Sequence, residues 1–260
     1  MNMIKVVNKR KYGSMFHYAH FICDCLFPEI INDIYRYEEV FREKNIHQTI
    51  GNFDKIYTEV MKTKNNEIMY EEFNKLDAEI LIYKNKEDYL DKIYFEKFRN
   101  FIFQRYHLSF SEYDPTYPEI ILIKRGDRIH LIDDEYLASI NHNMTTGKER
   151  REIDEIDKVE NYLTNTYEDK FKSLFFEHVP FQEQVKYFAN AKIIICAHGA
   201  VMSNMFFCKE HTIIIEVTCK MNWVFFDDLS RILMLKHIKC VKNEYDDIIS
   251  CIEMHCPKKI

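Results

Sequence analysis

The sequence contains little glycine and little proline, with five residues of each among 260. It has no GxGxxG pattern, so a glycine-rich dinucleotide-binding loop is excluded. No segment reaches the roughly 18 uninterrupted apolar residues of a membrane-spanning helix, so we expect no membrane span. The first residues contain neither an apolar signal core nor a small-residue cleavage site. We therefore expect a cytoplasmic protein, either virus-encoded or host-cytosolic.

An excess of basic residues is also absent, because 36 Lys and Arg face 42 Asp and Glu for a formal net charge of −6. This balance argues against a nucleic-acid partner, which usually requires a basic surface. The eight cysteines form no CxxC pair, and several lie in apolar runs, where free cysteine behaves as a small hydrophobe. We expect reduced thiols and no zinc site.

In the second half of the chain, apolar runs alternate with amphipathic segments. The alternation predicts a largely parallel α/β sheet, with helices between the strands and a closing helix over 245–254. The predicted strands are 119–124, 173–177, 192–197, 212–217 and 238–241.

The first half of the chain shows a less regular pattern. Apolar spacing predicts a helical segment over 17–47 and an amphipathic helix over 87–106, and short strands are predicted at 52–60 and 79–83. The stretch SEYDPTYP (111–118) holds two of the five prolines and is the best candidate for a linker. We therefore predict an N-terminal α/β domain over 1–113 and a C-terminal α/β domain over 119–260, with the closing helix able to pack back on the first.

The most informative stretch is KIIICAHGAVMSNMFFCKEHTIIIE (192–216). An apolar strand stops at His198, Gly199 and Ala200, which we call the HGA turn, and a short helix and a second strand follow. A helix that starts directly after a strand presents free backbone N–H groups, which favour an anion such as a phosphate. Gly199 lets the backbone approach a ligand closely because it has no Cβ. A plain α/β turn with a packing histidine would explain the same residues.

Charged residues follow the other predicted strands. Arg125 and Arg128 follow strand 119–124, and Glu177 and Glu216 stand at the ends of their strands. The carboxyl ends of parallel strands meet at one edge, so two arginines and a helix start there suit a diphosphate. A carboxylate such as Glu216 could accept ribose hydroxyls. Alternatively, each arginine is a solvated surface charge and Glu216 belongs to a salt bridge or cap.

A second candidate cluster lies near the N-terminus, in FHYAHFICDC. His20 and Asp24 are four residues apart and share a face of a helix, where a carboxylate can orient an imidazole and raise its basicity. The pair could act as a base, bind a sugar hydroxyl, or simply fix the helix. A Cys–His nucleophile made of Cys196 and His198 is disfavoured, because Cys196 should be buried and nothing activates it.

Five elements, in this order, resemble glycosyltransferase family 61. The first two are HFICD, which contains His20 and Asp24, and the strand and turn ILIKR with Arg128. They are followed by the helix FQEQV with Ala191, by the HGA turn with Asn204 and Phe206, and by the strand IEV with Glu216. The match runs through most of the chain.

The resemblance implies a GT-B-like fold, in which two Rossmann-like halves have a cleft between them. It also implies a nucleotide-sugar donor bound by the C-terminal half, UDP-linked and carrying GlcNAc or xylose. Family members invert the anomeric centre and are thought to need no metal, so no cofactor is expected. A metal-free enzyme must stabilise the leaving diphosphate with fixed positive charge.

Our leading hypothesis is an inverting glycosyltransferase that acts on a hydroxyl of a protein or glycan acceptor. The base candidates are His20, Asp24 and Glu177. The donor-binding candidates are Arg125, Arg128, His198, Gly199, Ala200, Asn204 and Glu216. Two rivals are a catalytically degenerate nucleotide-sugar or glycan-binding module of the same fold and another nucleotide-using α/β enzyme, such as a methyltransferase.

Overall fold

The computed structural model divides the chain into two compact units. The first consists of Met1–Arg105 and His130–Met144, and the second of Tyr106–Ile129 and Thr145–Ile260. The predicted domain bounds of 1–113 and 119–260 stay a prediction. The structure describes residues 2–7, 18–27, 30–31, 43–47, 56, 59–60, 68–73, 90–126, 151–217 and 224–256.

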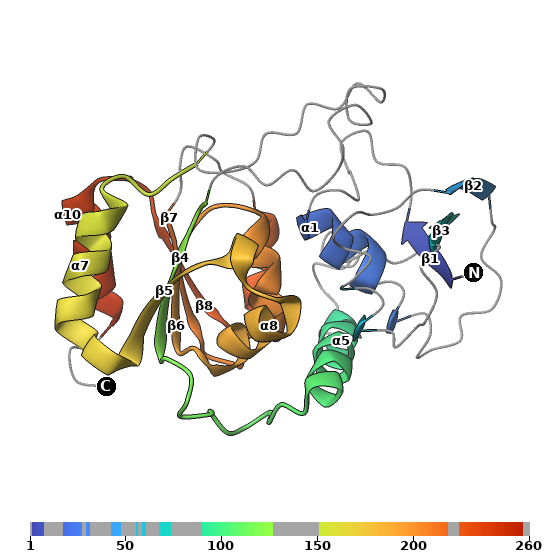
Figure 1. The fold of residues 1–260 in the computed structure, drawn as a ribbon, viewed down its shortest axis with the longest axis horizontal. Helices are drawn as coiled ribbons and strands as arrows, with labels where there is room; N and C mark the ends of the chain where they lie inside the picture. The colour runs from blue at the N-terminus through green and yellow to red at the C-terminus, as the bar shows by residue number, and fades with distance from the viewer. Residues whose placement is uncertain are drawn as a thin grey trace. The chain divides into compact units, whose positions relative to one another are not determined.

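The second unit is built on a five-stranded sheet in the order β5-β4-β6-β7-β8, and every pair of neighbours is parallel (Figure 1). This order places the first strand of the unit, β4, between the second and the third. The chain therefore winds outward in opposite directions from the gap between β4 and β6, which is the topological switch point. The strands are β4 (Ile120–Lys124), β5 (Phe171–Phe175), β6 (Ile193–Ala197), β7 (Ile213–Val217) and β8 (Lys236–Cys240).

Helices cover both faces of this sheet. On one face, α7 (Ile156–Tyr167) and α10 (Tyr245–His255) bury Val159, Leu163 and Ile252 against alternate strand residues such as Ile195. The opposite face carries α8 (Phe181–Asn190), the 3-10 helix η4 (Ala200–Phe207) and α9 (Phe225–Ile232). Figure 1 shows α7 and α10 on one side of the strands and α8 on the other. Short 3-10 helices η2 (Glu168–Lys170) and η3 (Phe176–His178) flank β5.

The central strands lie where the sequence predicted them, because strands covered on both faces form continuous apolar runs. All five residues of β6 are buried. The edge strand β5 begins and ends two residues earlier than predicted, so Glu177 lies in η3 rather than at a strand end. The half-exposed FKSLF pattern of β5 gave a weaker signal than the buried runs did. The closing helix α10 packs on α7, β7 and β8 of its own unit.

The described part of the first unit contains a mixed three-stranded sheet. β1 (Asn2–Val7) pairs in parallel with β3 (Ile68–Phe73), and β2 (Glu43–His47) pairs antiparallel with β3. β2 lies inside the predicted 17–47 helix, so that prediction was wrong for its last residues. Cross-strand pairing with β3 outweighed the weak helical pattern there.

The helical core of the first unit comes from an irregular N-terminal segment and one long helix. α1 (Tyr18–His20) continues into the π-helix η1 (Phe21–Leu26), and α5 (Leu90–Tyr106) confirms the predicted amphipathic helix. Phe27 packs on Phe95 and Phe98 of α5, with ring centroids 5.2 and 5.1 Å apart. Residues 56, 59 and 60 are helical, so the strand predicted at 52–60 was wrong at these described positions. The strand predicted at 79–83 lies outside the described residues.

Candidate functional site

Arg125 and the HGA turn meet at the carboxyl edge of the sheet, on the two sides of the switch point. Arg125 follows β4, and His198 follows β6. The Nη2 atom of Arg125 donates a hydrogen bond of 2.9 Å to the main-chain oxygen of His198, and Arg151 Nη1 lies 3.4 Å from the same oxygen. The structure thus brings together two of the sequence-predicted residues and adds Arg151, which no motif had indicated.

Gly199 makes room for the Arg125 guanidinium. A Cβ built on Gly199 would lie 1.7 Å from Arg125 Nη2, far inside van der Waals contact. The φ angle of 165° is extended backbone that any residue can adopt. Glycine is therefore needed at this position for the close approach of the arginine and not for an unusual backbone conformation.

The helix after the HGA turn starts without a side-chain cap. Gly199 is the N-cap of η4, no side chain caps it, and Met202 N donates to Gly199 O at 3.0 Å. The first N–H groups of a helix have no partner within the helix and attract anions. Ala200 is the first residue of η4, and its role in phosphate binding stays a prediction.

Glu216 is a buried carboxylate held by two histidines. It points to the face of the sheet covered by η4 and α9, and its side chain is 1% exposed. His198 Nδ1 contacts Glu216 Oε1, and His237 Nε2 lies 2.7 Å from Glu216 Oε2. Burial opposes ionisation, but the hydrogen bonds from both histidines outweigh it and lower the pKa of Glu216 to about 2.

The contact chain continues from His237 to the surface. His237 Nδ1 lies 3.1 Å from Asp227 Oδ1, at ion-pair distance but not aligned as a hydrogen bond, and Lys239 Nζ contacts Asp227 Oδ2. Neither Asp227 nor His237 was among the predicted site residues. The alternation of KHIKC, which places residues 237 and 239 on one face of β8, was the available signal.

Glu177 supports the loop that carries Arg125. Glu177 Oε1 accepts a hydrogen bond of 3.1 Å from the backbone N–H of Gly126. The residue itself is exposed, on η3. The carboxylate therefore contacts the residue that directly follows Arg125.

Asn204 lies in a buried amide network behind the HGA turn. Its Nδ2 donates to Gln184 Oε1 at 3.0 Å, and Gln184 Nε2 donates to the main-chain oxygens of Phe176 and Val179. These contacts join η4 to α8 and to η3, which carries Glu177. They give Asn204 a positioning contact within the protein.

The remaining predicted site residues are Arg128, Asp24 and His20. Arg128 lies outside the described residues, and so does the side chain of Asp24. His20 is half-buried at the end of α1, in the first unit. The pairing of His20 with Asp24 stays a prediction.

A scan against protein-family models matches residues 18–215 to Glycosyltransferase 61. The chain belongs to glycosyltransferase family 61. It is therefore a glycosyltransferase, which implies a nucleotide-sugar donor and an acceptor. The match contains Arg125 and the HGA turn but ends one residue before Glu216, so Asp227 and His237 lie beyond it. No curated protein sequence is significantly similar to the chain.

Cys196, on the strand that leads to the HGA turn, is poorly suited to act as a nucleophile in this family 61 protein. Burial, followed by the charge of Glu216, raises the pKa of the Cys196 thiol, which disfavours a thiolate nucleophile. Within the described ranges, no group of three or more His, Cys, Asp or Glu side chains could hold a metal ion. In the same part of the chain, no helix has both the length and the apolarity needed to cross a membrane.

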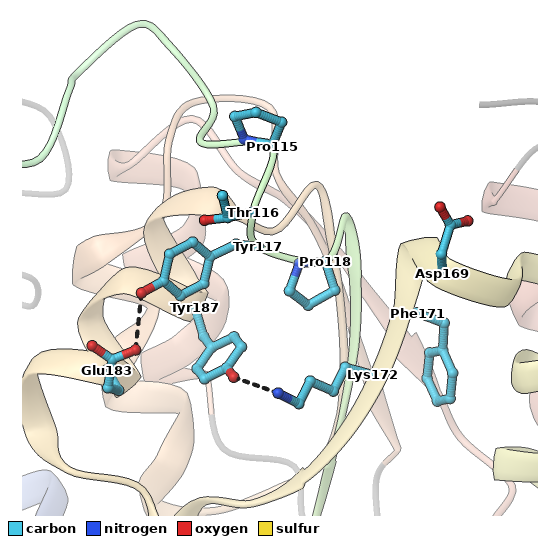
Figure 2. A pocket seen from close by; sticks show the side chains of 9 residues that line it. All are labelled: Pro115, Thr116, Tyr117, Pro118, Asp169, Phe171, Lys172, Glu183 and Tyr187. Carbon is cyan, nitrogen blue, oxygen red and sulfur yellow. Dashed lines mark hydrogen bonds between the residues drawn. The ribbon is translucent and has the colours of Figure 1, made fainter.

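A separate pocket of about 390 Å³ lies at the opposite, amino-terminal edge of the family 61 sheet (Figure 2). Figure 2 shows the Tyr117 hydroxyl pointing to Glu183, at 2.9 Å, and Lys172 pointing to the Tyr187 hydroxyl, also at 2.9 Å. The lining includes none of the predicted site residues. Ligands of open α/β sheets bind beyond the carboxyl ends of the strands, so we take the switch-point edge as the candidate site.

Proposed function

We propose that this glycosyltransferase moves a sugar from a UDP-linked donor, with GlcNAc or xylose as the sugar, to an acceptor hydroxyl on a protein or glycan. The transfer inverts the anomeric centre in a single displacement and needs no metal ion. Arg125, Arg128, the HGA turn, Asn204 and Glu216 form the donor side. Family membership supports the reaction class, and the geometry at the switch point supports the location of the donor.

The observation that carries the proposal is the contact between Arg125 and the HGA turn. A guanidinium presents five N–H donors in a planar fork that matches phosphate oxygens. In this protein it lies within 2.9 Å of the turn from which η4 begins. Fixed positive charge and backbone N–H groups thus converge where a leaving diphosphate would develop negative charge.

Within this proposal, His198 acts on the donor and Glu216 acts through His198. An ionised carboxylate only accepts hydrogen bonds, so His198 Nδ1 carries the proton that faces Glu216. This fixes the Nδ1–H tautomer of the ring, and we propose that His198 contacts the phosphate or the donor sugar when the donor binds. Both oxygens of Glu216 contact histidines, and for this reason we favour a positioning role over the ribose contact that the sequence suggested.

The acceptor hydroxyl needs a base, and we propose the pair His20 and Asp24. Glu177, the third candidate, already accepts a hydrogen bond from Gly126 and is better suited to holding the Arg125 loop. The GT-B arrangement belongs to the same proposal and is compatible with the division into two compact units. A cytoplasmic location stays a prediction.

The test is a thermal-shift panel of UDP-, GDP-, CMP- and dTDP-sugars, with and without EDTA, on the wild type and on Arg125→Ala and Arg125→Lys. A ligand at 100 times its Kd stabilises the native state by about 2.7 kcal/mol. We expect stabilisation by UDP-sugars that EDTA does not change, that Arg125→Ala abolishes and that Arg125→Lys weakens. A folded wild type that responds to none of the nucleotides would overturn the donor site and favour a degenerate binding module. An EDTA-sensitive shift would overturn the metal-free mechanism.

A further inference from the structure

His237 lies at the centre of a buried series of side-chain contacts in the second unit, which joins Asp227, His237, Glu216 and His198. Its side chain is 4% exposed, and its two ring nitrogens face two carboxylates, Glu216 on β7 and Asp227 on α9. Lys239, two residues further along β8, contacts the other oxygen of Asp227. The chain of contacts therefore runs from the partly exposed Asp227 inward to Glu216 and on to His198.

Burying charged side chains in this way is costly unless every polar atom is paired. A buried carboxylate left with one unmatched oxygen destabilises the fold, and a carboxylate paired at both oxygens is also fixed in rotation. Glu216 is of the second kind, since His198 holds Oε1 and His237 holds Oε2. The orientation of Glu216, and with it the plane of the His198 ring, thus depends on His237.

His198 also contacts the arginine of the proposed donor site. The main-chain oxygen of His198 accepts the hydrogen bond of Arg125, and the ring of Phe226 on α9 packs edge-on against the His198 ring at 5.6 Å. Other charged or ionisable groups around the chain of contacts are Cys196 on β6 and Arg151. The contacts of His237 and Glu216 thus end at His198, the residue whose main-chain oxygen binds Arg125.

We propose that His237 is a positioning residue, which orients Glu216 and thereby fixes the tautomer and plane of His198 for catalysis. This inference rests on the proposed function, because it assigns His198 to the donor side. His237 and Asp227 lie beyond the part of the chain that matches the family model. The inference therefore adds residues that the family match does not contain.

Substitutions of His237 separate its two contacts. Gln can place an amide N–H where His237 Nε2 stands, so His237→Gln keeps a donor for Glu216. His237→Leu is similar in size and removes the donor. The side chain of Asp227 is 40% exposed. Asp227→Asn removes its negative charge beside His237 and leaves the contact between His237 and Glu216 in place. His211→Asn is the control, because His211 is exposed on a turn with φ 68°, a region that Asn tolerates.

The first readout is the ¹⁵N NMR spectrum of the histidine rings in the full chain between pH 5 and 8. We expect His198 to be the Nδ1–H tautomer in the wild type, in His237→Gln and in His211→Asn. His237→Leu should mix the tautomers, and Asp227→Asn should shift the His198 resonances by less. Unchanged His198 signals in a folded His237→Leu protein would overturn the inference. If that variant does not fold, unchanged His198 signals in Asp227→Asn would overturn it.

The second readout is release of UDP from UDP-GlcNAc and UDP-xylose. His237→Leu should lower kcat at least tenfold with KM changed less than threefold, and His237→Gln should recover most of the rate. A purely structural role would lower the amount of folded protein but leave kcat per folded molecule unchanged, and that result would overturn the inference. The NMR readout needs no donor, so it remains valid if neither UDP-sugar binds and the proposed function fails.

Discussion

The guanidinium of Arg125 fills the space that a side chain on Gly199 would occupy. Nη2 lies 1.7 Å from the position of an ideal Cβ on Gly199 while it donates to the neighbouring carbonyl of His198. The two residues are far apart in the sequence and come from different strands. Each explains the other, because the arginine reaches the HGA turn only where residue 199 has no Cβ.

The first prediction concerns Gly199→Ala. The extended backbone at residue 199 accepts alanine, so the methyl group should displace the guanidinium and leave the fold intact. We expect UDP affinity to fall at least tenfold, about 1.4 kcal/mol, with little change in melting temperature without ligand. Calorimetric titration with UDP measures the first effect and a thermal melt the second.

Gly126→Ala is the matched control for that substitution. A Cβ on Gly126 would meet Glu177 and Phe175 atoms at 3.6 Å, which is ordinary contact. UDP affinity should therefore stay within about twofold of the wild type. Equal losses in both variants would contradict the idea that displacement of Arg125 is the cause.

The second prediction separates two roles of Glu177. In Glu177→Gln a side-chain oxygen can still accept the hydrogen bond from Gly126, whereas Glu177→Ala removes it. We expect the Gln variant to release UDP from UDP-sugars at a rate within about threefold of wild type, and the Ala variant to bind UDP more weakly. A Gln variant that binds UDP normally but is inactive would instead make Glu177 the catalytic base.

The third prediction concerns acid stability. Contacts with His198 and His237 lower the pKa of Glu216 from its ordinary value of 4.5 to about 2 in the folded state. A carboxyl group whose pKa is lower in the folded state stabilises the fold, and this stabilisation is fully present at pH values above the pKa of the unfolded state. That contribution is lost as the pH falls through the folded value. Protonation of Glu216 should therefore lower the free energy of unfolding by about 3 kcal/mol between pH 5 and pH 2.

Urea denaturation at several pH values, with Glu216→Gln beside the wild type, measures this contribution. The variant should be less stable at pH 7 and should lose less stability on acidification. Parallel curves for the two proteins would mean that Glu216 does not titrate in this window.

The fourth prediction tests the location of the donor against the pocket of Figure 2. Lys172→Ala and Tyr187→Phe each remove the hydrogen bond between these residues, at the amino-terminal edge of the sheet. Because ligands of such sheets bind at the carboxyl edge, we expect both variants to bind UDP within about twofold of wild type. If Lys172→Ala lost UDP binding and Arg125→Ala kept it, the donor site would have to be assigned to the pocket of Figure 2.

The second half of the fold could be predicted from the sequence because its central strands are buried on both faces. Apolar runs such as IIICA are typical of buried strands and fit few other elements. Because the strands are parallel, the residues that follow them lie at the same edge of the sheet. This placed Arg125, the HGA turn and Glu216 near one another before any coordinates. The edge strand β5 was misplaced by two residues because none of its residues is fully buried, so its apolar signal is weak.

Contacts that depend on side chains from distant segments could not be predicted. His237 lies on an edge strand after the last motif, and only the register of β8 beside β7 brings it to Glu216. The contacts of Asp227 could not be predicted because its partners, His237 and Lys239, lie on a different element. Likewise β2 depends on pairing with β3, which a local helical pattern cannot show.

The edge strand β8 has a consequence beyond the site. It is the last strand of the described sheet, and the His237 residue is partly exposed although its side chain is 4% exposed, so the exposure falls on the backbone. Open edges invite pairing with a strand of another molecule, and charged lysines discourage it. Lys236 and Lys239 put such charges on the strand that holds His237. The five residues of β8 therefore combine edge-protecting lysines with the histidine that contacts Glu216.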